Sequence, residues 1–350
     1  MTANQRYFLV GIGGSGMMPL AMILAGRGAS VAGSDRSLDQ GRVPAKFDAL
    51  RALGVTLHPQ DGSGITAPDQ IVVASAAVEE TVADLVTATR LGCPRLTRAE
   101  LNARLFNASA LPIGVAGTSG KSTVTGMIAA ILHAAGGDPT VMNGAVMKDF
   151  ASADRPFASA LVGRGDAYVS EVDESDGSIA LYAPRIAVLN NVSLDHKSLE
   201  ELNRLFAAFI GKAAHAIVNI DNPDAAALAL ALPRDRVTRF AIDRAADLQA
   251  TDVVEEPFAA SFSLGGTRVR LAVPGRHNVA NALAAIGAAL AAGIPLDQAI
   301  AGIERFTGLK RRFDLVGSAG GVAVIDDFGH NPDKIAATLD TLHAFPGRVL

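Results

Sequence analysis

The sequence predicts an α/β protein built from more than one domain. Short β-branched runs alternate with helical stretches rich in Ala and Leu, and this alternation stops near residue 108 and then starts again. Because strands that alternate with helices wind on a parallel sheet, each series predicts a sheet with helices packed on its faces. A chain of 350 residues with 49% hydrophobic residues is long enough to bury more than one such core.

The first series takes up residues 1–108 and predicts a Rossmann-like domain. Its expected strands and helices lie, in order, at 6–13, 17–28 (helix), 30–35, 70–76 and 79–92 (helix). Residues 97–112 read as a helix followed by a polar linker and a proline, and a new strand is expected at 113–117. This break places the first domain boundary near residue 108.

The second series takes up residues 109–312 and predicts a central α/β domain. Its expected elements after the first strand lie, in order, at 166–175, 185–193, 199–210 (helix), 214–221, 236–273 (strand-rich) and 276–293 (helix). A last break falls near Arg312, and residues 322–350 read strand, loop, helix, strand. We expect residues 313–350 to begin a third Rossmann-like domain, which is incomplete because the chain ends at Leu350.

A glycine-rich loop follows the strand that opens the second series. In LPIGVAGTSGKSTVTGMIAAIL, residues 111–132, an apolar strand runs into this loop and the loop runs directly into a helix. Glycines let backbone N–H groups converge on an anion, the helix N-terminus adds positive charge, Lys121 neutralises phosphate oxygens and Ser122 can bind Mg²⁺. The pattern predicts a central domain of the P-loop ATPase type, although Val115 replaces the first glycine of the general motif. A turn that binds no ligand is the alternative. The predicted phosphate-binding residues are Gly117, Thr118, Ser119, Gly120, Lys121, Ser122 and Thr123.

Acidic, amide and imidazole side chains follow two later strands of the same series. Residues 168–178 carry Glu171, Asp173, Glu174 and Asp176, and residues 186–198 carry Asn190, Asn191, Asp195 and His196. A bound Mg²⁺-nucleotide needs such ligands near the ends of neighbouring strands. A solvated acidic loop is the alternative for the first set, and a capping or surface role is the alternative for His196. Their shared position after strands that follow the phosphate loop favours metal and phosphate binding.

A second glycine-rich motif lies near the N-terminus. Gly11-Ile12-Gly13-Gly14-Ser15-Gly16 matches Gly-x-Gly-x-x-Gly between a strand and a helix, and Asp35 follows Gly16 after nineteen residues. This spacing is typical of a dinucleotide site, so a nicotinamide-dependent oxidoreductase is the main alternative class. An oxidoreductase of this class would give the glycine-rich loop at 117–123 no functional role. A ligand with a uridine diphosphate group would use the same loop chemistry.

Charge and composition exclude several other classes. The formal charge of −4 gives no basic field for a nucleic acid, and Cys93 is the only cysteine, which suits a reducing compartment. No export signal is visible in the first residues, and the longest apolar segment, 279–294, is short for a membrane span. We therefore expect a cytoplasmic protein that binds neither nucleic acid nor membrane.

Taken together, these motifs resemble the Mur ligase family of peptidoglycan precursor synthesis. The resemblance covers essentially the whole chain and depends on segments that occur in the family's order and approximate spacing. These segments are GIGGSGMMPLA with GSD at 33–35, GTSGKST, EVDESD, LNNVSLDH, VPGRHNVANALAAI, GLKRRFD and VIDDFGHNP.

The resemblance implies an ATP- and Mg²⁺-dependent amide ligase, either a monomer or a homodimer. Such an enzyme converts the carboxylate of UDP-N-acetylmuramate to an acyl phosphate and joins it to L-alanine or a short peptide. The resemblance implies catalytic roles for Lys121, Glu171 and His196, and a metal site of Ser122, Glu171 and His196. It extends the ATP site to Asn143, Asn278, Asn281, Arg312 and Asp327. It places the UDP-sugar on Gly13, Gly14, Ser15, Gly16, Met17, Asp35 and Ser75.

The sequence leaves three alternative functions within the family: two enzymatic branches and a relative without catalytic activity. The motifs favour the branch that adds L-alanine, whereas LNN before the Asp-His pair is similar to the branch that recycles a ready-made tripeptide. A nucleotide-binding relative without catalytic activity is the third possibility. Because the third domain supplies contacts to the incoming amino acid in the family, we expect residues 1–350 alone to bind UDP-sugar and ATP but to ligate poorly.

Overall fold

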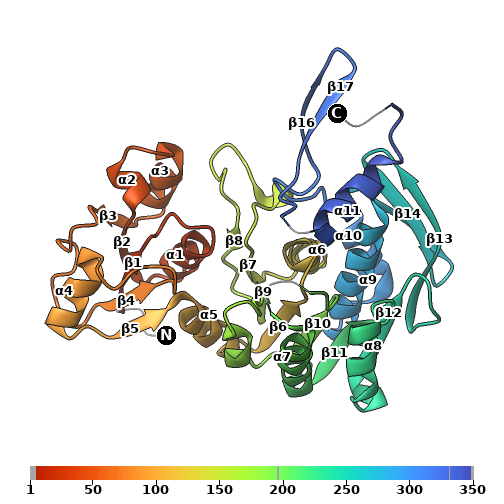
Figure 1. Ribbon diagram of the computed structural model, residues 1–350, viewed down its shortest axis with the longest axis horizontal. Coiled ribbons are helices and arrows are strands. Elements are labelled where there is room, and N and C mark those ends of the chain that lie inside the picture. The colour runs from red at the N-terminus through yellow and green to blue at the C-terminus, as the bar shows by residue number, and fades with distance from the viewer. Residues whose placement is uncertain (1–4, 195–196, 331, 348–350) are drawn as a thin grey trace.

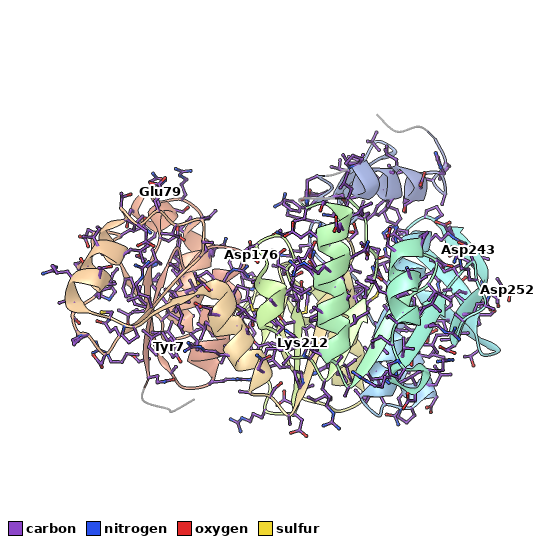
Figure 2. The ribbon with its side chains drawn as sticks, turned by 60° about the horizontal axis from the view of Figure 1, so that its bottom comes forward. Tyr7, Glu79, Asp176, Lys212, Asp243 and Asp252 are labelled. Atoms are coloured by element: carbon purple, nitrogen blue, oxygen red, sulfur yellow. The ribbon has the colours of Figure 1, made fainter. Side chains whose placement is uncertain are left out.

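The computed structural model describes residues 5–194, 197–330 and 332–347. A five-stranded sheet, a ten-stranded sheet and a two-stranded hairpin follow one another along this part of the chain. Figure 1 shows the first sheet, in red and orange, at one end of the long axis, and the hairpin projecting beside the second sheet. In Figure 2 Glu79 lies toward one end of this long axis and Asp252 lies at the other. The α/β class predicted from the sequence is confirmed.

The N-terminal part is a parallel sheet with helices on both faces. Its strands are β1 (Arg6–Val10), β2 (Ser30–Ser34), β3 (Thr56–His58), β4 (Ile71–Ala74) and β5 (Arg95–Thr97). Its helices are α1 (Met17–Gly26), α2 (Arg36–Asp39), α3 (Pro44–Ala52), α4 (Ala83–Leu91) and α5 (Arg98–Asn107). The strand order β3-β2-β1-β4-β5 makes β1 the point at which the chain changes direction across the sheet. Ligands of such sheets bind at the carboxyl end of that strand, where residues 11–16 lie.

Helix α1 is apolar on all sides because it packs between two sheets. Its residues from Met17 to Leu24 are buried apart from Met22, and it contacts both β2 and the last two strands of the second sheet, β7 (Thr140–Met142) and β8 (Ala160–Leu161). A helix buried in this way needs no polar face. One hydrophobic core therefore runs from the first sheet into the second.

The second sheet holds the remaining strands of the central part. They are β6 (Leu111–Ala116), β9 (Ala167–Glu171), β10 (Ile186–Leu189), β11 (His215–Asn219), β12 (Val237–Ala241), β13 (Leu248–Glu256), β14 (Ala259–Leu264) and β15 (Thr267–Leu271). The helices are α6 (Lys121–Ala134), α7 (Leu199–Lys212), α8 (Pro223–Leu230), α9 (Arg276–Ala291) and α10 (Leu296–Ile303). Three short 3₁₀ segments are η1 (Lys148–Phe150), η2 (Ser178–Leu181) and η3 (Arg234–Arg236). No helix in the described residues is long and apolar enough to cross a membrane.

Strand β6 lies at the change of direction in the second sheet. The order β15-β14-β13-β12-β11-β10-β6-β9-β7-β8 places β9 on one side of β6 and β10 on the other, both parallel to it. Helices α6, α9 and α10 pack together on one face, while α7 and α8 cover β10 and β11 on the other. The loops that follow β6, β9 and β10 therefore meet at one edge, which is where the phosphate loop lies.

Helix α5 links the two sheets through a buried polar network. Asn102 Nδ2 donates to Ser170 Oγ at 3.0 Å and to Tyr182 Oη at 2.8 Å, and Asn102 Oδ1 accepts from Tyr168 Oη at 2.8 Å. Burial raises the pKa of Tyr168, and burial raises the pKa of Tyr182 to about 12, so both hydroxyls stay protonated. Phe106 packs edge-on against both tyrosine rings. The first turns of α5 are thus fixed relative to β9.

The chain differs from the sequence prediction in several elements, because β3, β5, β7, β8, α3 and α8 were not predicted. Strand β6 begins at Leu111 instead of 113, so Pro112 is its second residue. The third part contains a strand that the sequence analysis did not predict, β16 (Asp314–Ala319), which pairs antiparallel with β17 (Val322–Asp326) before α11 (Pro332–Leu342). Gly320 and Gly321, both with positive φ, form the turn between them, as expected for a two-residue hairpin loop.

The last predicted strand reaches residues 348–350, outside the described residues. The domain limits at 108 and 312 fall between α5 and β6 and between α10 and β16, and they stay a prediction.

Candidate active site

The phosphate loop, residues 117–123, joins β6 to α6. Gly117 and Gly120 have φ values of 133° and 83°, which favour glycine. A Cβ on Gly120 would lie 2.4 Å from Asn190 Nδ2 and 2.6 Å from Asn281 Oδ1. Glycine at position 120 is therefore required both by the backbone conformation and by the close approach of neighbouring amides.

Two asparagines that follow β10 hold this loop in place. Asn191 Oδ1 accepts hydrogen bonds from Ser119 N at 2.8 Å and from Thr118 Oγ1 at 2.9 Å. Asn190 Nδ2 donates to Ser119 O at 3.1 Å and to Asn281 Oδ1 at 2.9 Å. The loop conformation is thus supported by side chains from the neighbouring strand and from α9.

Lys121 forms an ion pair within the cleft. Its Nζ lies 2.8 Å from Glu174 Oε2 and 3.1 Å from Glu174 Oε1, and it donates to Gly117 O at 2.7 Å. The Lys121 and Glu174 side chains are only 20% and 5% exposed. Burial raises the pKa of the Glu174 carboxyl, and the charge of Lys121 opposes this shift. The loop lysine is therefore held by a buried carboxylate.

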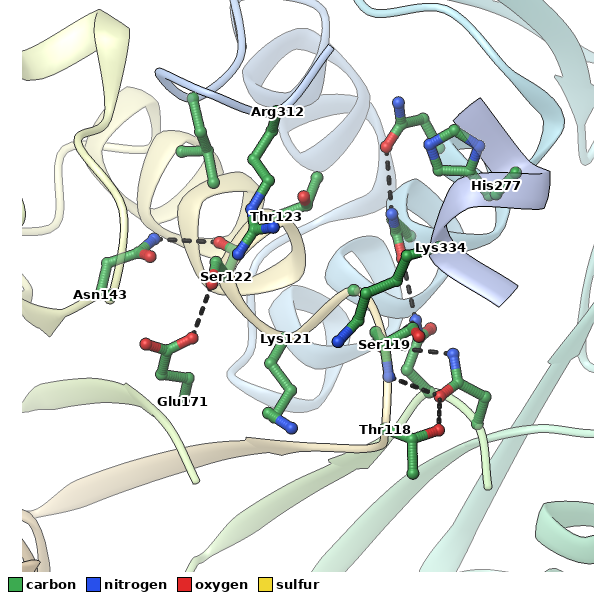
Figure 3. A pocket seen from close by; sticks show the side chains of 18 of the residues that line it. Thr118, Ser119, Lys121, Ser122, Thr123, Asn143, Glu171, His277, Arg312 and Lys334 are labelled. Atoms are coloured by element: carbon green, nitrogen blue, oxygen red, sulfur yellow. Dashed lines mark hydrogen bonds between the residues drawn. The ribbon is translucent and has the colours of Figure 1, made fainter. Parts of the chain in front are cut away.

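Ser122 and Glu171 meet on the other side of the loop. Glu171 is the last residue of β9, and its Oε2 accepts a hydrogen bond from Ser122 Oγ at 2.7 Å. Asn143, after β7, donates from Nδ2 to Ser122 O at 2.9 Å. Figure 3 shows these three side chains grouped at the start of α6. A Cβ on Gly144 would lie 2.2 Å from Glu171 Oε1, so this glycine leaves room beside the carboxylate.

The first turns of α9 contribute a row of buried amides. Asn281 Nδ2 donates to Asn278 Oδ1 at 3.0 Å, and Asn278 Nδ2 donates to Pro274 O at 2.7 Å. Both asparagines are nearly inaccessible, at 3% and 6% exposed. With Asn190 they form one continuous hydrogen-bonded chain that ends at the phosphate loop.

The third part of the chain covers the opposite side of the loop. Arg312 donates from Nη1 to Phe328 O at 3.3 Å and lies 5.3 Å from the centroid of the Phe328 ring. Asp327 Oδ2 accepts from Phe313 N at 2.8 Å. In Figure 3, Arg312 and Lys334 both extend toward the phosphate loop, Lys334 from α11. Positive charge thus approaches the loop from outside the central sheet.

These groups line one cleft of about 660 Å³. His277 also lines it; desolvation lowers the pKa of this imidazole, and the charge of Asp327 opposes the shift. The predicted ATP-site and metal-site residues on its wall are Thr118, Ser119, Gly120, Lys121, Ser122, Thr123, Asn143, Glu171, Asn278, Asn281, Arg312 and Asp327. Gly117 adjoins them through its hydrogen bond with Lys121. The structure therefore brings together residues that are up to about two hundred positions apart, as expected where loops of a parallel sheet share one edge.

The N-terminal glycine loop is shaped by a carboxylate. Gly13 N donates to Asp35 Oδ2 at 2.8 Å, and Asp35 Oδ1 caps α2 by accepting from Ser37 N at 2.8 Å. Lys46 Nζ donates to Gly13 O at 2.8 Å. Gly16, the residue before α1, also lines the 660 Å³ cleft, so this loop borders the phosphate loop's site. The predicted UDP-sugar residues Gly13, Gly14, Ser15, Gly16, Met17 and Asp35 lie together here.

Two predicted residues are not placed with either glycine loop. Ser75 lines a separate hollow at the ends of β4 and β5, together with Arg95 and Glu100. His196 lies outside the described residues, so its predicted metal role stays a prediction. Several further cleft residues, among them Arg98, Glu174 and Lys334, lie outside the set of predicted site residues. Glu174 belongs to the acidic run noted in the sequence, but no pattern in that run indicates which carboxylate faces Lys121.

Within the described residues, no group of three or more His, Cys, Asp or Glu side chains is placed to hold a metal ion. The predicted metal residues Ser122 and Glu171 are in contact, and both offer oxygen. Magnesium prefers oxygen ligands and takes only one or two carboxylates from the protein when a nucleotide supplies the rest.

Comparison with known proteins places the chain in a family. Three sequence models match consecutive segments: "Mur ligase family, catalytic domain" at 6–110, "Mur ligase middle domain" at 115–289 and "Mur ligase, glutamate ligase domain" at 311–350. The chain belongs to the Mur ligase family. A UDP-N-acetylmuramate–L-alanine ligase of Streptomyces coelicolor is 38% identical to this Mur ligase over 359 aligned residues, which cover 99% of this chain and 75% of that protein.

Two solved structures resemble this Mur ligase along nearly its whole length. A UDP-N-acetylmuramate–alanine ligase from Thermotoga maritima has a TM-score of 0.84 at 24% identity and covers 98% of this chain and 78% of its own. A murein peptide ligase from Psychrobacter arcticus has a TM-score of 0.79 at 26% identity, and the match covers 96% of this chain and 75% of that protein's chain. The family models also cover both glycine-rich loops, so an oxidoreductase that uses Gly11–Gly16 is not favoured.

Proposed function

We propose that this Mur ligase joins UDP-N-acetylmuramate to L-alanine at the expense of ATP. The observation that carries the proposal is the shared cleft, in which a phosphate loop with Lys121 and Ser122 lies beside a second glycine loop that ends at Gly16. One ligand carries a triphosphate and the other a diphosphate, and each of these glycine loops suits one of them. The relatives at 38% identity bear the corresponding name.

A triphosphate would complete the polar groups of the phosphate loop. Ser119 Oγ is buried without a hydrogen-bond partner among the described residues, and Asn190 Oδ1 is buried in the same state. A buried polar group without a partner costs free energy unless a ligand or water supplies one. The loop N–H groups, the α6 N-terminus and Lys121 supply the positive charge that such a ligand needs.

The reaction needs no covalent enzyme nucleophile. An oxygen of the substrate carboxylate attacks the γ-phosphorus of ATP, the bond to the β,γ-bridging oxygen breaks, and ADP leaves. The amine of L-alanine then attacks the acyl carbon of the acyl phosphate, and inorganic phosphate leaves as the amide forms. Lys121 would stabilise charge on the phosphoryl oxygens, and Arg312 and Lys334 would add positive charge from the third part of the chain. The residues act by alignment and electrostatic stabilisation.

The residues around Ser122 fit a magnesium ion. Ser122 and Glu171 would hold it, with His196 as the third predicted ligand, and the glycine at 144 leaves space beside the Glu171 carboxylate. When bound, the ion supplies charge neutralisation for the phosphate oxygens. Asn143 keeps the helix start in place by its hydrogen bond to Ser122 O.

L-Alanine is favoured over a tripeptide as the incoming amine. Curated relatives that cover 98% to 99% of this chain at 38% identity are named as alanine ligases, whereas the murein peptide ligase structure is 26% identical. The cytoplasmic location and the monomeric or dimeric state stay predictions from the sequence.

Release of phosphate from ATP tests this function. We expect release only when UDP-N-acetylmuramate and L-alanine are both present, with a product whose mass equals the sum of the two minus one water. UDP-N-acetylglucosamine is the matched control, because it has the same nucleotide and lacks the lactyl carboxylate. Release with the tripeptide instead of L-alanine would assign the recycling branch. Oxidation of NADH without any phosphate release would overturn the ligase assignment.

A further inference from the structure

Glu174 is the buried carboxylate of the cleft. Of the acidic residues that line the cleft in the described part of the chain, only Glu174 is buried; they are Glu171, Asp173, Glu174 and Asp327. Both oxygens of the Glu174 carboxylate lie within hydrogen-bond distance of Lys121 Nζ. A buried carboxylate needs such a partner, because an unpaired charge away from water is costly. The charge of Glu174 is therefore tied to the position of Lys121.

The proposed reaction takes Lys121 away from Glu174. An ammonium group that binds the transferred phosphoryl oxygens has to turn from the carboxylate toward the nucleotide. Burial raises the pKa of Glu174, the charge of Lys121 opposes this shift, and the charge of Asp173 adds to it. Once the lysine has moved, the opposition is lost and the Glu174 carboxylate becomes a stronger base.

The second step of the reaction needs a base at this place. The amino group of a free amino acid is mostly an ammonium at neutral pH, and its nitrogen has no lone pair for attack until a proton is removed. The acyl carbon that it attacks is two bonds from the transferred phosphorus. The oxygens on that phosphorus are the proposed partners of Lys121, whose Nζ lies 2.8 Å from Glu174 Oε2. On the proposed function, the incoming ammonium therefore approaches beside the Glu174 carboxylate.

The other carboxylates of the cleft suit this role less well. Glu171 is assigned to the magnesium site. Asp327 Oδ2 accepts a hydrogen bond from Phe313 N at 2.8 Å. Burial raises the pKa of Asp173, but hydrogen bonds from Ser175 and two nearby cations hold it below its usual value, which makes it a weak base.

Two histidines line the cleft in the described part of the chain, and both are poorer bases than Glu174. His330 Nδ1 lies 3.2 Å from Phe328 O, which can only accept, so the imidazole proton is on Nδ1. The other nitrogen, Nε2, lies 3.1 Å from Lys334 Nζ, and its lone pair therefore accepts from that ammonium. His277 is the second residue of α9, and desolvation lowers the pKa of its imidazole, which weakens it as a base.

We propose that Glu174 is the general base of the second step and takes a proton from the ammonium group of the incoming amino acid after Lys121 has moved to the phosphate. This inference rests on the proposed function. The nitrogen then attacks the acyl carbon, the bond from that carbon to the phosphate oxygen breaks, and the second proton of the nitrogen leaves with the phosphate as hydrogen phosphate. Glu174 returns its proton to solvent and pairs with Lys121 again.

Single-turnover measurements with Glu174→Gln separate the two steps. Without an amine, formation of ADP from ATP and UDP-N-acetylmuramate should stay within about three-fold of the wild-type rate, because this step uses no base. With saturating L-alanine, amide formation should fall by about a hundred- to ten-thousand-fold, the range for loss of a general base. Glu174→Asp keeps a carboxylate and should give an intermediate rate.

Hydroxylamine in place of L-alanine distinguishes a base from a structural residue. It is largely unprotonated at neutral pH, so it attacks an acyl phosphate without a base and gives a hydroxamate. We expect Glu174→Gln to form the hydroxamate at the wild-type rate. Asp176→Asn, which changes an exposed carboxylate in the same loop, is the matched control and should leave the rates of ADP, amide and hydroxamate formation unchanged.

Three results would overturn the proposal. Unchanged amide formation by Glu174→Gln would mean that another group is the base. Equal losses of amide and hydroxamate would mean that Glu174 only holds the acyl phosphate in place, and slow ADP formation would assign Glu174 to the first step. A wild-type chain that forms no ADP with UDP-N-acetylmuramate would instead overturn the proposed function, and this proposal with it.

Discussion

The two glycine-rich loops of this Mur ligase have the same position in their sheets but different surroundings. Each follows the strand at which the strand order of its sheet changes direction, and each precedes a helix. The N-terminal loop is held by a carboxylate, Asp35, which accepts from Gly13 N. The central loop is held by neutral amides, Asn190 and Asn191, and its own lysine pairs with Glu174.

We relate this difference to the roles proposed for the two loops: the N-terminal loop binds a ligand, and the central loop takes part in the reaction. The Asp35 carboxylate accepts a hydrogen bond from one loop N–H group and adds negative charge beside the loop. This arrangement suits a loop that only holds a diphosphate and does not stabilise a reacting phosphoryl group. Neutral amides leave the positive potential of the loop uncancelled, and Lys121, Ser122 and Glu171 would act on the transferred phosphoryl group under the proposed function. On the proposed function, the same fold element would bind a ligand that does not react in the N-terminal part and a ligand that reacts in the central part.

Removing the loop lysine should have the largest effect. Lys121→Ala is expected to lower kcat by about a thousand-fold or more, because charge that develops on the phosphoryl oxygens loses its nearest cation. UDP affinity should stay within about two-fold, since the N-terminal loop keeps its contacts. Steady-state phosphate release and UDP calorimetry measure the two quantities. Lys212→Ala, which removes an exposed lysine, is the control. A parallel loss of UDP binding would contradict the separation of the two loops.

Removing the carboxylate from the N-terminal loop should have a moderate effect. Asp35→Ala takes away the cap of α2 and the partner of Gly13 N, so we expect a loss of about 1–2 kcal/mol in the free energy of unfolding. UDP should bind several-fold more weakly because the loop is less ordered, while kcat at saturating substrate is retained. Chemical denaturation and calorimetry give both values, with the exposed Asp48→Ala as control. Complete loss of UDP binding in a protein of unchanged stability would mean that Asp35 contacts the ligand directly.

The sequence was sufficient to predict the local features on which this comparison depends. Both loops, their flanking strands and helices, and the carboxyl-edge position of Glu171 follow from glycine spacing and hydrophobic periodicity. These are short-range patterns, because a strand, a turn and a helix each depend on neighbours a few residues away. The Gly320-Gly321 pair also carried a hairpin signal, which the sequence analysis did not use.

Contacts between distant segments were not predictable in the same way. Nothing in the acidic run at 171–176 indicates that Glu174 turns toward Lys121, because the chain after β9 bends irregularly. Arg98 follows an ordinary capping signal, and its place beside Gly16 depends on how α5 packs against β9. Such contacts depend on how loops and helices from distant parts of the chain pack together, which no local pattern in the sequence indicates.

The smallest effect on ligand binding is expected from a change in the ion pair between Lys121 and Glu174 in the central loop. Lys121 must leave Glu174 to reach a phosphate oxygen, so the pair competes with nucleotide binding. Glu174→Gln replaces a charged acceptor by a neutral one of equal size, and we expect an ATP analogue to bind about five-fold more tightly. Asp176→Asn, in the same loop but exposed, should leave this affinity unchanged.

Titration sharpens this prediction, because burial raises the pKa of Glu174 above its usual value. Above that pKa, Glu174 is ionised and holds Lys121; as the pH falls through it, the carboxyl takes up a proton and the lysine is released. Affinity of the wild-type chain for the analogue should therefore rise toward that of Glu174→Gln on acidification, and the difference should be largest at neutral pH and above. Calorimetry at a series of pH values measures the difference. A difference that is constant with pH, or weaker binding by the variant, would mean that Glu174 supports the nucleotide site instead of competing with it.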